Sequence, residues 1–221
     1  MPTSRPDRST QTTSSELDEG LLERFLGGDD HAFTALYERY ESRVLTYLRT
    51  ILKERPEVAD DIFQETFLKL YHERKRYATA SAGDSEGEAY ATIRNFRGWL
   101  FRVAHNLAIS HLRSARTGYS LSDDEETHRW DERLMVPIEE SFAGLFAEED
   151  PLTSDSLYEK LRAAVDLLPR TLRDVYVLRE INGLEYEEVA ETVGCTPEAA
   201  RMRISRARRS LRKALEPYLP G

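Results

Sequence analysis

Residues 184–213, LEYEEVAETVGCTPEAARMRISRARRSLRK, determine the fold of the C-terminal part of the chain. Two short helical patterns meet at Gly194-Cys195-Thr196, where Thr196 is a good N-cap and Pro197 suits the first helical position. The second pattern carries seven basic side chains, and no acid occurs between residues 199 and 213. A helix, a tight glycine turn and a basic second helix are typical of the helix-turn-helix, which places side chains in the major groove of DNA.

The second of these helical patterns has one apolar face. At 100° per residue, the positions predicted to be buried are Ala200, Ile204, Ala207, Leu211 and Leu215. The basic side chains lie outside this face or flank it. A solvated basic helix that closes a bundle would carry similar charge, but the turn spacing, the marked cap and the absence of acids favour DNA binding.

Bulk composition limits the class of protein. The chain has 221 residues, 40% of them hydrophobic and 32% charged, which favours small helical units over one thick globule. Cys195 is the single cysteine, so no disulfide forms within the chain and a cytoplasmic location fits. The N-terminal residues lack an apolar signal core, and no stretch approaches the roughly 18 apolar residues of a membrane span. We therefore expect a soluble cytoplasmic protein without membrane insertion.

The negative charge of the chain is concentrated in one segment. The formal net charge is −9, and residues 114–156 carry 12 acidic and only 3 basic side chains, which accounts for the same net charge. Residues 157–221 carry 12 basic and 10 acidic side chains, a net +2. The acidic total thus describes a linker and does not argue against binding to nucleic acid.

The rest of the pattern predicts an all-α chain of two small helical domains joined by this acidic linker. Residues 1–15 are rich in Ser, Thr and Pro and are predicted to be disordered. Residues 16–113 read as a four-helix domain, with a glycine-bearing loop at 77–94. Residues 114–156 form the linker, where short apolar islands favour partner docking over a third core. Residues 157–221 form a second domain, whose helices break at Pro169, Gly183 and Gly194.

Two further groups of polar residues stand out in the first domain. Asp61, Gln64, Glu65 and Leu68 recur at i, i+3, i+4 and i+7 and share one helical surface, which is either plain solvation or a binding face. The helix carrying Trp99 combines arginines with nearby aromatics, a mixture that can stack and hold unpaired bases. The alternative, core aromatics beside surface arginines, is favoured for Phe96 and Trp99.

Taken together, these motifs resemble the extracytoplasmic-function (ECF) group of bacterial RNA polymerase sigma factors. FxxLYxxY at 33–40, DIFQETFL at 61–68, and Trp99-Leu100 with Asn106 and Arg113 are similar to sigma domain 2. Leu168-Pro169, VYVLR at 175–179, GLEYEEVA at 183–190 and RISRAR at 203–208 are similar to sigma domain 4. The resemblance covers about residues 25–113 and 157–213, in the order of the family.

The resemblance implies a transcription initiation factor without enzymatic activity, cofactor or metal. Its partners would be promoter DNA, core RNA polymerase through the β′ clamp helices and the β flap, and an anti-sigma factor. Asp61, Gln64, Glu65 and Leu68 would bind the polymerase clamp, and the linker would follow the channels that the polymerase builds for polyanions. The implied contacts to the −10 element are Tyr77, Arg97, Trp99, Asn106, Ser110 and Arg113, with the loop 77–94 capturing an extruded base.

The implied contacts to the −35 element lie on the basic helix and its cap: Thr196, Glu198, Ala199, Arg201, Met202, Arg203, Arg206 and Arg209. In this set Arg203 and Arg206 would contact phosphates while Glu198, Ala199 and Met202 face bases. A conventional helix-turn-helix regulator with a helical sensing or dimerising domain is the alternative function. An enzyme is not supported, because the sequence has no P-loop, no metal-spaced His/Cys cluster and no nucleophile motif.

Overall fold

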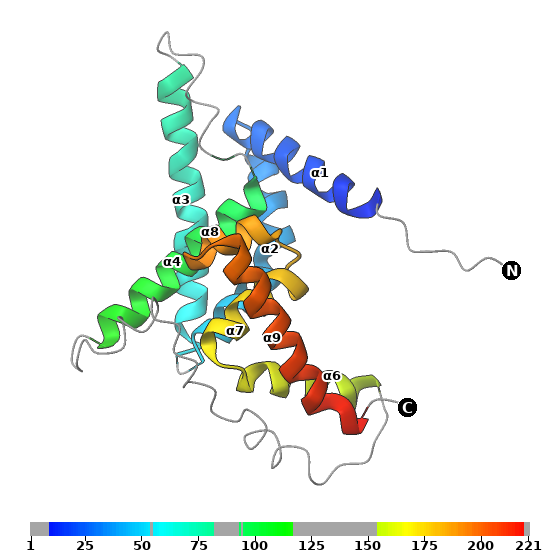
Figure 1. Ribbon diagram of the computed structural model, residues 1–221. Helices are drawn as coiled ribbons and strands as arrows, with labels where there is room; N and C mark the ends of the chain where they lie inside the picture. The colour runs from blue at the N-terminus through cyan, green and yellow to red at the C-terminus, as the bar shows by residue number, and fades with distance from the viewer. Residues whose placement is uncertain (1–8, 54, 82–92, 94, 117–153, 219–221) are drawn as a thin grey trace, which may run out of the picture. The chain divides into compact units, whose positions relative to one another are not determined.

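The computed structural model describes residues 9–53, 55–81, 93, 95–116 and 154–218 (Figure 1). Every regular element in these ranges is a helix, which confirms the predicted all-α class. The chain divides into two compact units, Met1–Ala108 and Ile109–Gly221. Most of the predicted acidic linker falls outside the described residues. None of the helices within the described ranges has both the length and the apolar character that a membrane span requires.

The first unit contains α1 (Ser9–Leu26), α2 (Asp30–Ile51), α3 (Val58–Ser81) and the part of α4 (Phe96–Arg116) that ends at Ala108. Helix α1 packs on α2 and α3, and α2 packs on α3. Asp29 caps α2, since its Oδ1 accepts the backbone N–H of His31 at 2.9 Å. The Arg24 side chain donates to Asp29 Oδ2 at 2.6 Å, and this hydrogen bond is the main reason that the pKa of Asp29 is lowered.

Helix α2 supplies the centre of this core. Its buried side chains recur every three or four residues, as on the core face of a helix: Ala32, Leu36, Tyr40, Val44, Tyr47, Leu48 and Ile51. Tyr40 packs against Phe96 of α4 with ring centroids 5.4 Å apart, and its hydroxyl donates to Asp18 of α1. Two turns further along α2, the Tyr47 hydroxyl is hydrogen bonded to His105 Nδ1 of α4 at 2.8 Å. Two buried tyrosines thus tie α2 to α1 and to α4.

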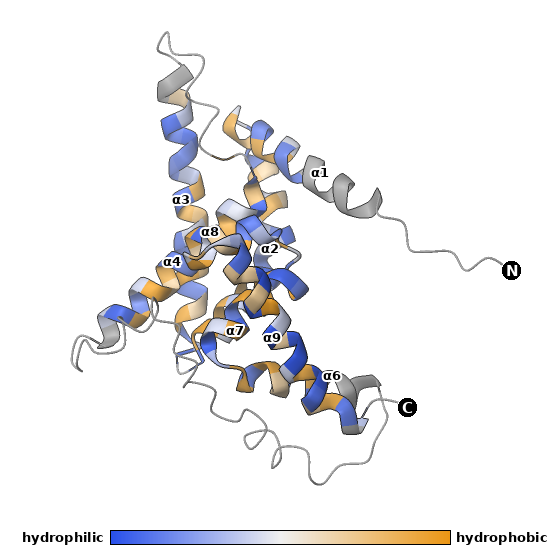
Figure 2. Cartoon of the chain, in the orientation of Figure 1, coloured by the Kyte–Doolittle hydropathy of each residue, from blue (hydrophilic) through white to orange (hydrophobic). Residues whose placement is uncertain are grey.

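The second unit is built around α9. Its elements are α6 (Ser154–Leu167), α7 (Arg170–Tyr176), the π-helix η3 (Val177–Ile181), α8 (Tyr186–Val193), α9 (Pro197–Leu215) and the 3-10 turn η4 (Glu216–Tyr218). Helix α9 packs on α6, α7 and α8. The predicted breaks at Pro169, Gly183 and Gly194 are confirmed, and both glycines have positive φ, 70° and 68°. Apolar and polar positions alternate around the helices of both units (Figure 2).

The buried face of α9 differs from the prediction at one position. Ala200, Ile204, Ala207 and Leu211 are buried as expected, but Ala214 completes the face and Leu215 is only half-buried. Ala214 lies three residues after Leu211, whereas Leu215 is the last residue before the chain tightens into η4.

The helix bounds differ from the predicted segments at three places. Helix α1 begins at Ser9, within the predicted tail 1–15. Helix α3 continues to Ser81, so residues 77–81 belong to a helix and not to a loop. Alanines at 78 and 80 favour helix, and the first glycine comes only at Gly83. Helix α4 extends to Arg116, three residues into the predicted linker.

Candidate nucleic-acid interface

The turn between α8 and α9 has the geometry that the sequence predicted. Gly194 adopts a left-handed conformation, and a Cβ added there would meet nothing within 4 Å. Glycine is therefore required by the backbone angle and not by lack of space. The backbone N–H of Cys195 donates to the carbonyl of Ala190 at 2.9 Å and closes α8. Thr196 Oγ1 then accepts the backbone N–H of Ala199 at 3.2 Å, with Pro197 at the first position of α9.

The predicted DNA-contacting side chains of α9 lie opposite its buried face or beside it. Arg206 and Arg209 are exposed, and Met202 is 49% exposed although it is apolar. Ala199 and Arg203 are half-buried. The remaining predicted positions are exposed: Thr196, Glu198 and Arg201.

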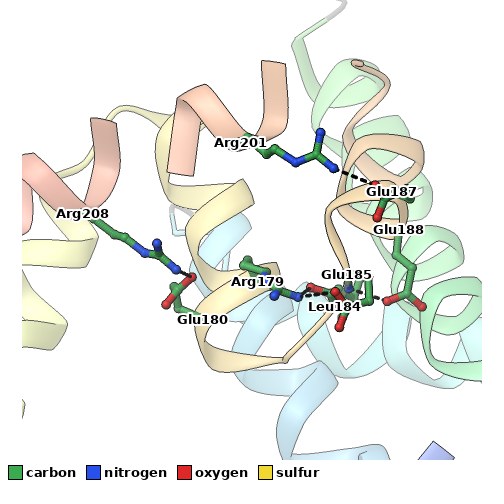
Figure 3. Close-up of polar contacts among 8 residues, drawn as sticks. All are labelled: Arg179, Glu180, Leu184, Glu185, Glu187, Glu188, Arg201 and Arg208. Carbon is green, nitrogen blue, oxygen red and sulfur yellow. Dashed lines mark hydrogen bonds and ion pairs between the residues drawn. The ribbon is translucent and has the colours of Figure 1, made fainter. Parts of the chain in front are cut away.

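Several arginines of the second unit are held by acids on neighbouring elements (Figure 3). Arg201 donates to Glu187 Oε1 of α8 at 2.9 Å, and its guanidinium lies 3.7 Å from Glu198. Arg208 donates to Glu180 Oε1 of η3 at 2.7 Å. These pairs join α9 to both preceding elements, and they fix part of the positive charge of α9 before any DNA arrives.

The connection between η3 and α8 is fastened by Arg179. Its guanidinium donates to the carbonyl of Leu184 at 2.6 Å and to Glu185 Oε2 at 3.0 Å (Figure 3). The start of α8 is capped by a second carboxylate, since the backbone N–H of Glu185 donates to Glu188 Oε2 at 2.5 Å. Sequence reasoning missed this network: the Arg179 contacts span five and six residues, which matches no helical period, whereas the i, i+3 spacing of Glu185 and Glu188 is a capping-box signal that could have found part of it.

The predicted polymerase-binding residues share one exposed face of α3. Asp61, Gln64 and Glu65 are exposed, and Leu68 is 53% exposed. The side chains between them are buried and hold the helix against its neighbours: Ile62, Phe63, Thr66 and Phe67. Tyr71 lies on the same side one turn further on and is 41% exposed, a position that the sequence pattern did not single out.

The predicted −10 contacts divide into two groups. Asn106, Ser110 and Arg113 are exposed at i, i+4 and i+7, so they share one face of α4. Trp99 is only 9% exposed and stacks near Phe96, with ring centroids 6.4 Å apart. Its indole is therefore part of the core, which is the alternative that the residues favoured.

The remaining −10 positions lie on different elements. Arg97 is half-buried at the start of α4, and Tyr77 is half-buried on α3. Residues 82–92 and 94 of the predicted capture loop lie outside the described residues. For metals, the described part of the chain holds no group of three or more His, Cys, Asp or Glu side chains suited to an ion.

Comparison with known families matches both halves of the chain. Residues 36–83 match the model of sigma-70 region 2, and residues 158–211 match the model of sigma-70 region 4. The first match contains the exposed face of α3. The second contains η3, α8 and most of α9.

Relatives of known identity align over nearly the whole chain. The RNA polymerase sigma-H factor of Pseudomonas aeruginosa is 31% identical over 216 residues, which cover 93% of this chain and 97% of the relative. The ECF RNA polymerase sigma-E factor of Haemophilus influenzae is 28% identical, with 91% and 97% covered.

A solved structure supports the fold independently. The sigma factor RpoE, solved in complex with the anti-sigma factor NepR from Bartonella quintana, aligns with a TM-score of 0.51 and 22% identity, covering 83% of this chain and 96% of that one. With regions 2 and 4 matched in order and a relative aligned from end to end, this chain belongs to the ECF group of the sigma-70 family and is a transcription initiation factor that directs transcription to specific promoters.

Proposed function

We propose that the chain binds core RNA polymerase through α3 and contacts promoter DNA at two places, with α9 on the −35 duplex and α4 on the −10 strand. The observation that carries this proposal is that the exposed faces of α3 and α9 each lie within one of the two family matches, residues 36–83 and 158–211. The corresponding domain boundaries are 16–113 and 157–221, with the tail 1–15 before them and the linker 114–156 between them.

The exposed face of α3 is suited to a protein partner. It combines the carboxylates of Asp61 and Glu65, the amide of Gln64 and the apolar side chain of Leu68. Leu68 would supply buried apolar area at the centre of the contact, and the polar groups around it would fix the register. We assign this face to the β′ clamp helices of the polymerase, and the second unit to the β flap.

On α9, the division of labour follows from side-chain chemistry. Arg203 and Arg206 would neutralise phosphates, and Arg209 extends the same basic surface. Glu198, Ala199 and Met202 would face base edges in the major groove. Thr196 marks the helix N-terminus, whose backbone amides favour a phosphate, while Arg201 contributes from its fixed position beside Glu187.

On α4, Asn106, Ser110 and Arg113 would contact the −10 strand along one exposed face. Arg97 and Tyr77 would add contacts from the half-buried start of α4 and from α3, and Trp99 would support that surface from the core. Promoter opening then relies on binding energy without covalent chemistry, cofactor or metal.

The remaining partners follow from charge and from the relatives. The acidic linker would follow the polyanion channels of the polymerase, where carboxylates resemble nucleic acid in charge. Because the RpoE relative was solved with an anti-sigma factor, we assign an anti-sigma partner to this chain as well. The site of action is the cytoplasm, together with the polymerase.

The α3 assignment is tested by the triple variant Asp61→Ala, Gln64→Ala and Glu65→Ala. We expect the affinity for sigma-free core polymerase to fall by about tenfold or more, roughly 1.4 kcal/mol, because the polar rim of the contact is removed. The helical circular dichroism should not change, since all three side chains are exposed.

The matched control is Glu38→Ala with Glu41→Ala, which removes two exposed carboxylates from α2. The control should bind core polymerase like the wild type. Equal affinity of the triple variant and the wild type would refute the α3 assignment. An equal loss of affinity in the control would show that the loss follows from the change in net charge and not from the face of α3.

A further inference from the structure

Tyr186, the first residue of α8, lies at a meeting point of arginines from two other elements. The guanidinium carbon of Arg179 in η3 lies 4.6 Å from the centroid of the Tyr186 ring. The guanidinium carbon of Arg201 in α9 lies 5.1 Å from the same centroid. Both distances fall within the range of a cation–π contact.

Arg208 is held by the element before α8. It donates to Glu180 Oε1 of η3 at 2.7 Å, and this hydrogen bond is the main reason that the pKa of Arg208 is raised. Arg201 and Arg208 are seven residues apart, two turns along one side of α9. This side of α9 is therefore held by Tyr186 at Arg201 and by Glu180 at Arg208.

The carboxylates around Tyr186 complete the arrangement. Glu187 binds Arg201 and Glu180 binds Arg208, while Arg179 is held by the carbonyl of Leu184 (Figure 3). The ring thus contacts the guanidinium groups of Arg179 and Arg201, whose charges are balanced by neighbouring carboxylates. Such a cluster restrains the rotamers of Arg201 and Arg208, and it restrains the angle between α8 and α9.

We propose that Tyr186 is a positioning residue for −35 recognition, which holds Arg201 of α9 against Arg179 of η3 and so fixes the orientation of α9 before DNA binds. The inference rests on the proposed assignment of α9 to the −35 element. The physical gain is preorganisation: a helix already held at its binding angle loses less conformational freedom when it enters the groove. Tyr186 itself needs no contact with DNA for this role.

The test uses the full chain assembled with core polymerase, on a promoter mapped by transcription in vitro with the wild-type holoenzyme. The quantity measured is the ratio of apparent affinities for this promoter and for the same promoter with a scrambled −35 element. In Tyr186→Leu we expect this ratio to fall by about tenfold, because both cation–π contacts are lost. In Tyr186→Phe, which keeps the ring, the ratio should stay within about threefold of the wild type.

The control variant is Tyr218→Leu, which removes a ring that lies 4.1 Å from Lys160 Nζ in the same unit but on η4. We expect it to keep the wild-type ratio, and the affinity for the scrambled promoter should be the same in every variant. If circular dichroism shows that Tyr186→Leu unfolds, Tyr186→Met provides the same comparison with an unbranched side chain.

Two results would overturn the proposal: a wild-type ratio in Tyr186→Leu, or an equal fall in Tyr218→Leu. An equal fall in Tyr186→Phe would show that the cation–π contacts of the ring do not set the ratio, and it would overturn the proposal as well. A wild-type ratio close to one would instead refute the assignment of α9 to the −35 element, so the two failures are distinguishable.

Discussion

Asp174 lies in α7 with its carboxylate buried in the second unit. Its Oδ2 is 3.6 Å from Arg170 Nε, while Oδ1 finds no hydrogen-bond partner among the described atoms. Burial raises the pKa of Asp174 to about 6, against the opposing effects of Arg170 and Arg173. The sequence could not predict this group, because TLRDVY has the alternation of charges expected on a solvated helix and only tertiary packing encloses the acid.

The raised pKa predicts that stability depends on pH. Because the folded pKa exceeds the unfolded value of 3.8, the stabilising contribution is complete below pH 3.8 and is lost as the pH rises through about 6. The contribution of Asp174 to the free energy of unfolding should therefore decrease over this window, by on the order of 2–3 kcal/mol at about 1.4 kcal/mol per pKa unit.

Denaturant unfolding of the wild type and of Asp174→Asn, followed by circular dichroism at several pH values, measures this contribution. We expect the variant to gain stability relative to the wild type as the pH rises from about 4 to 6.5. Parallel pH profiles for the two proteins would contradict the buried, titrating carboxyl.

Among the elements, those with local signals were predictable from sequence. Pro169, Gly183 and Gly194 mark helix ends, and the cap at Thr196 is a property of two or three adjacent residues. The π-helix η3 was not predictable, since its side-chain support includes the buried amide of Asn182, which donates to the carbonyl of Val177 at 3.1 Å. The cluster around Tyr186 was missed for a different reason: it joins η3, α8 and α9 through contacts between residues that are not neighbours in sequence.

The turn between α8 and α9 gives a prediction at this scale. Gly194→Ala should destabilise the chain by about 1–2 kcal/mol, because an L-residue is strained at φ 68° although its Cβ would meet no atom. Gly20→Ala is the matched control: Gly20 lies within α1 and a Cβ there also meets nothing within 4 Å. That change should be stabilising by about 0.5–1 kcal/mol, because alanine favours helix.

Thermal unfolding of both glycine variants separates the effect of backbone strain at residue 194 from the effect of adding a methyl group to an open position. Opposite signs are expected for the two substitutions. Stabilisation by Gly194→Ala would show that the turn does not need a left-handed residue, which would remove the local basis of the helix-turn-helix.

For the whole molecule, charge distribution and motif order carried more than the overall composition. A chain of net charge −9 binds DNA in this account because the acids are concentrated at residues 114–156 and α9 is basic. The sequence was sufficient for the helical class, for the exposed faces of α3 and α9, and for the family. For Trp99 the residues favoured the core whereas the resemblance implied a −10 contact, and only the packed structure shows that the indole is buried.

The central claim is that this chain gives core RNA polymerase its promoter specificity, and transcription with purified components tests it most directly. The full chain is added to sigma-free core polymerase, and complex formation and transcription from genomic fragments are measured. We predict that the chain co-migrates with the core enzyme and that discrete promoter-specific transcripts start only when it is present. Absence of co-migration, or transcripts no different from those of core polymerase alone, would contradict the account.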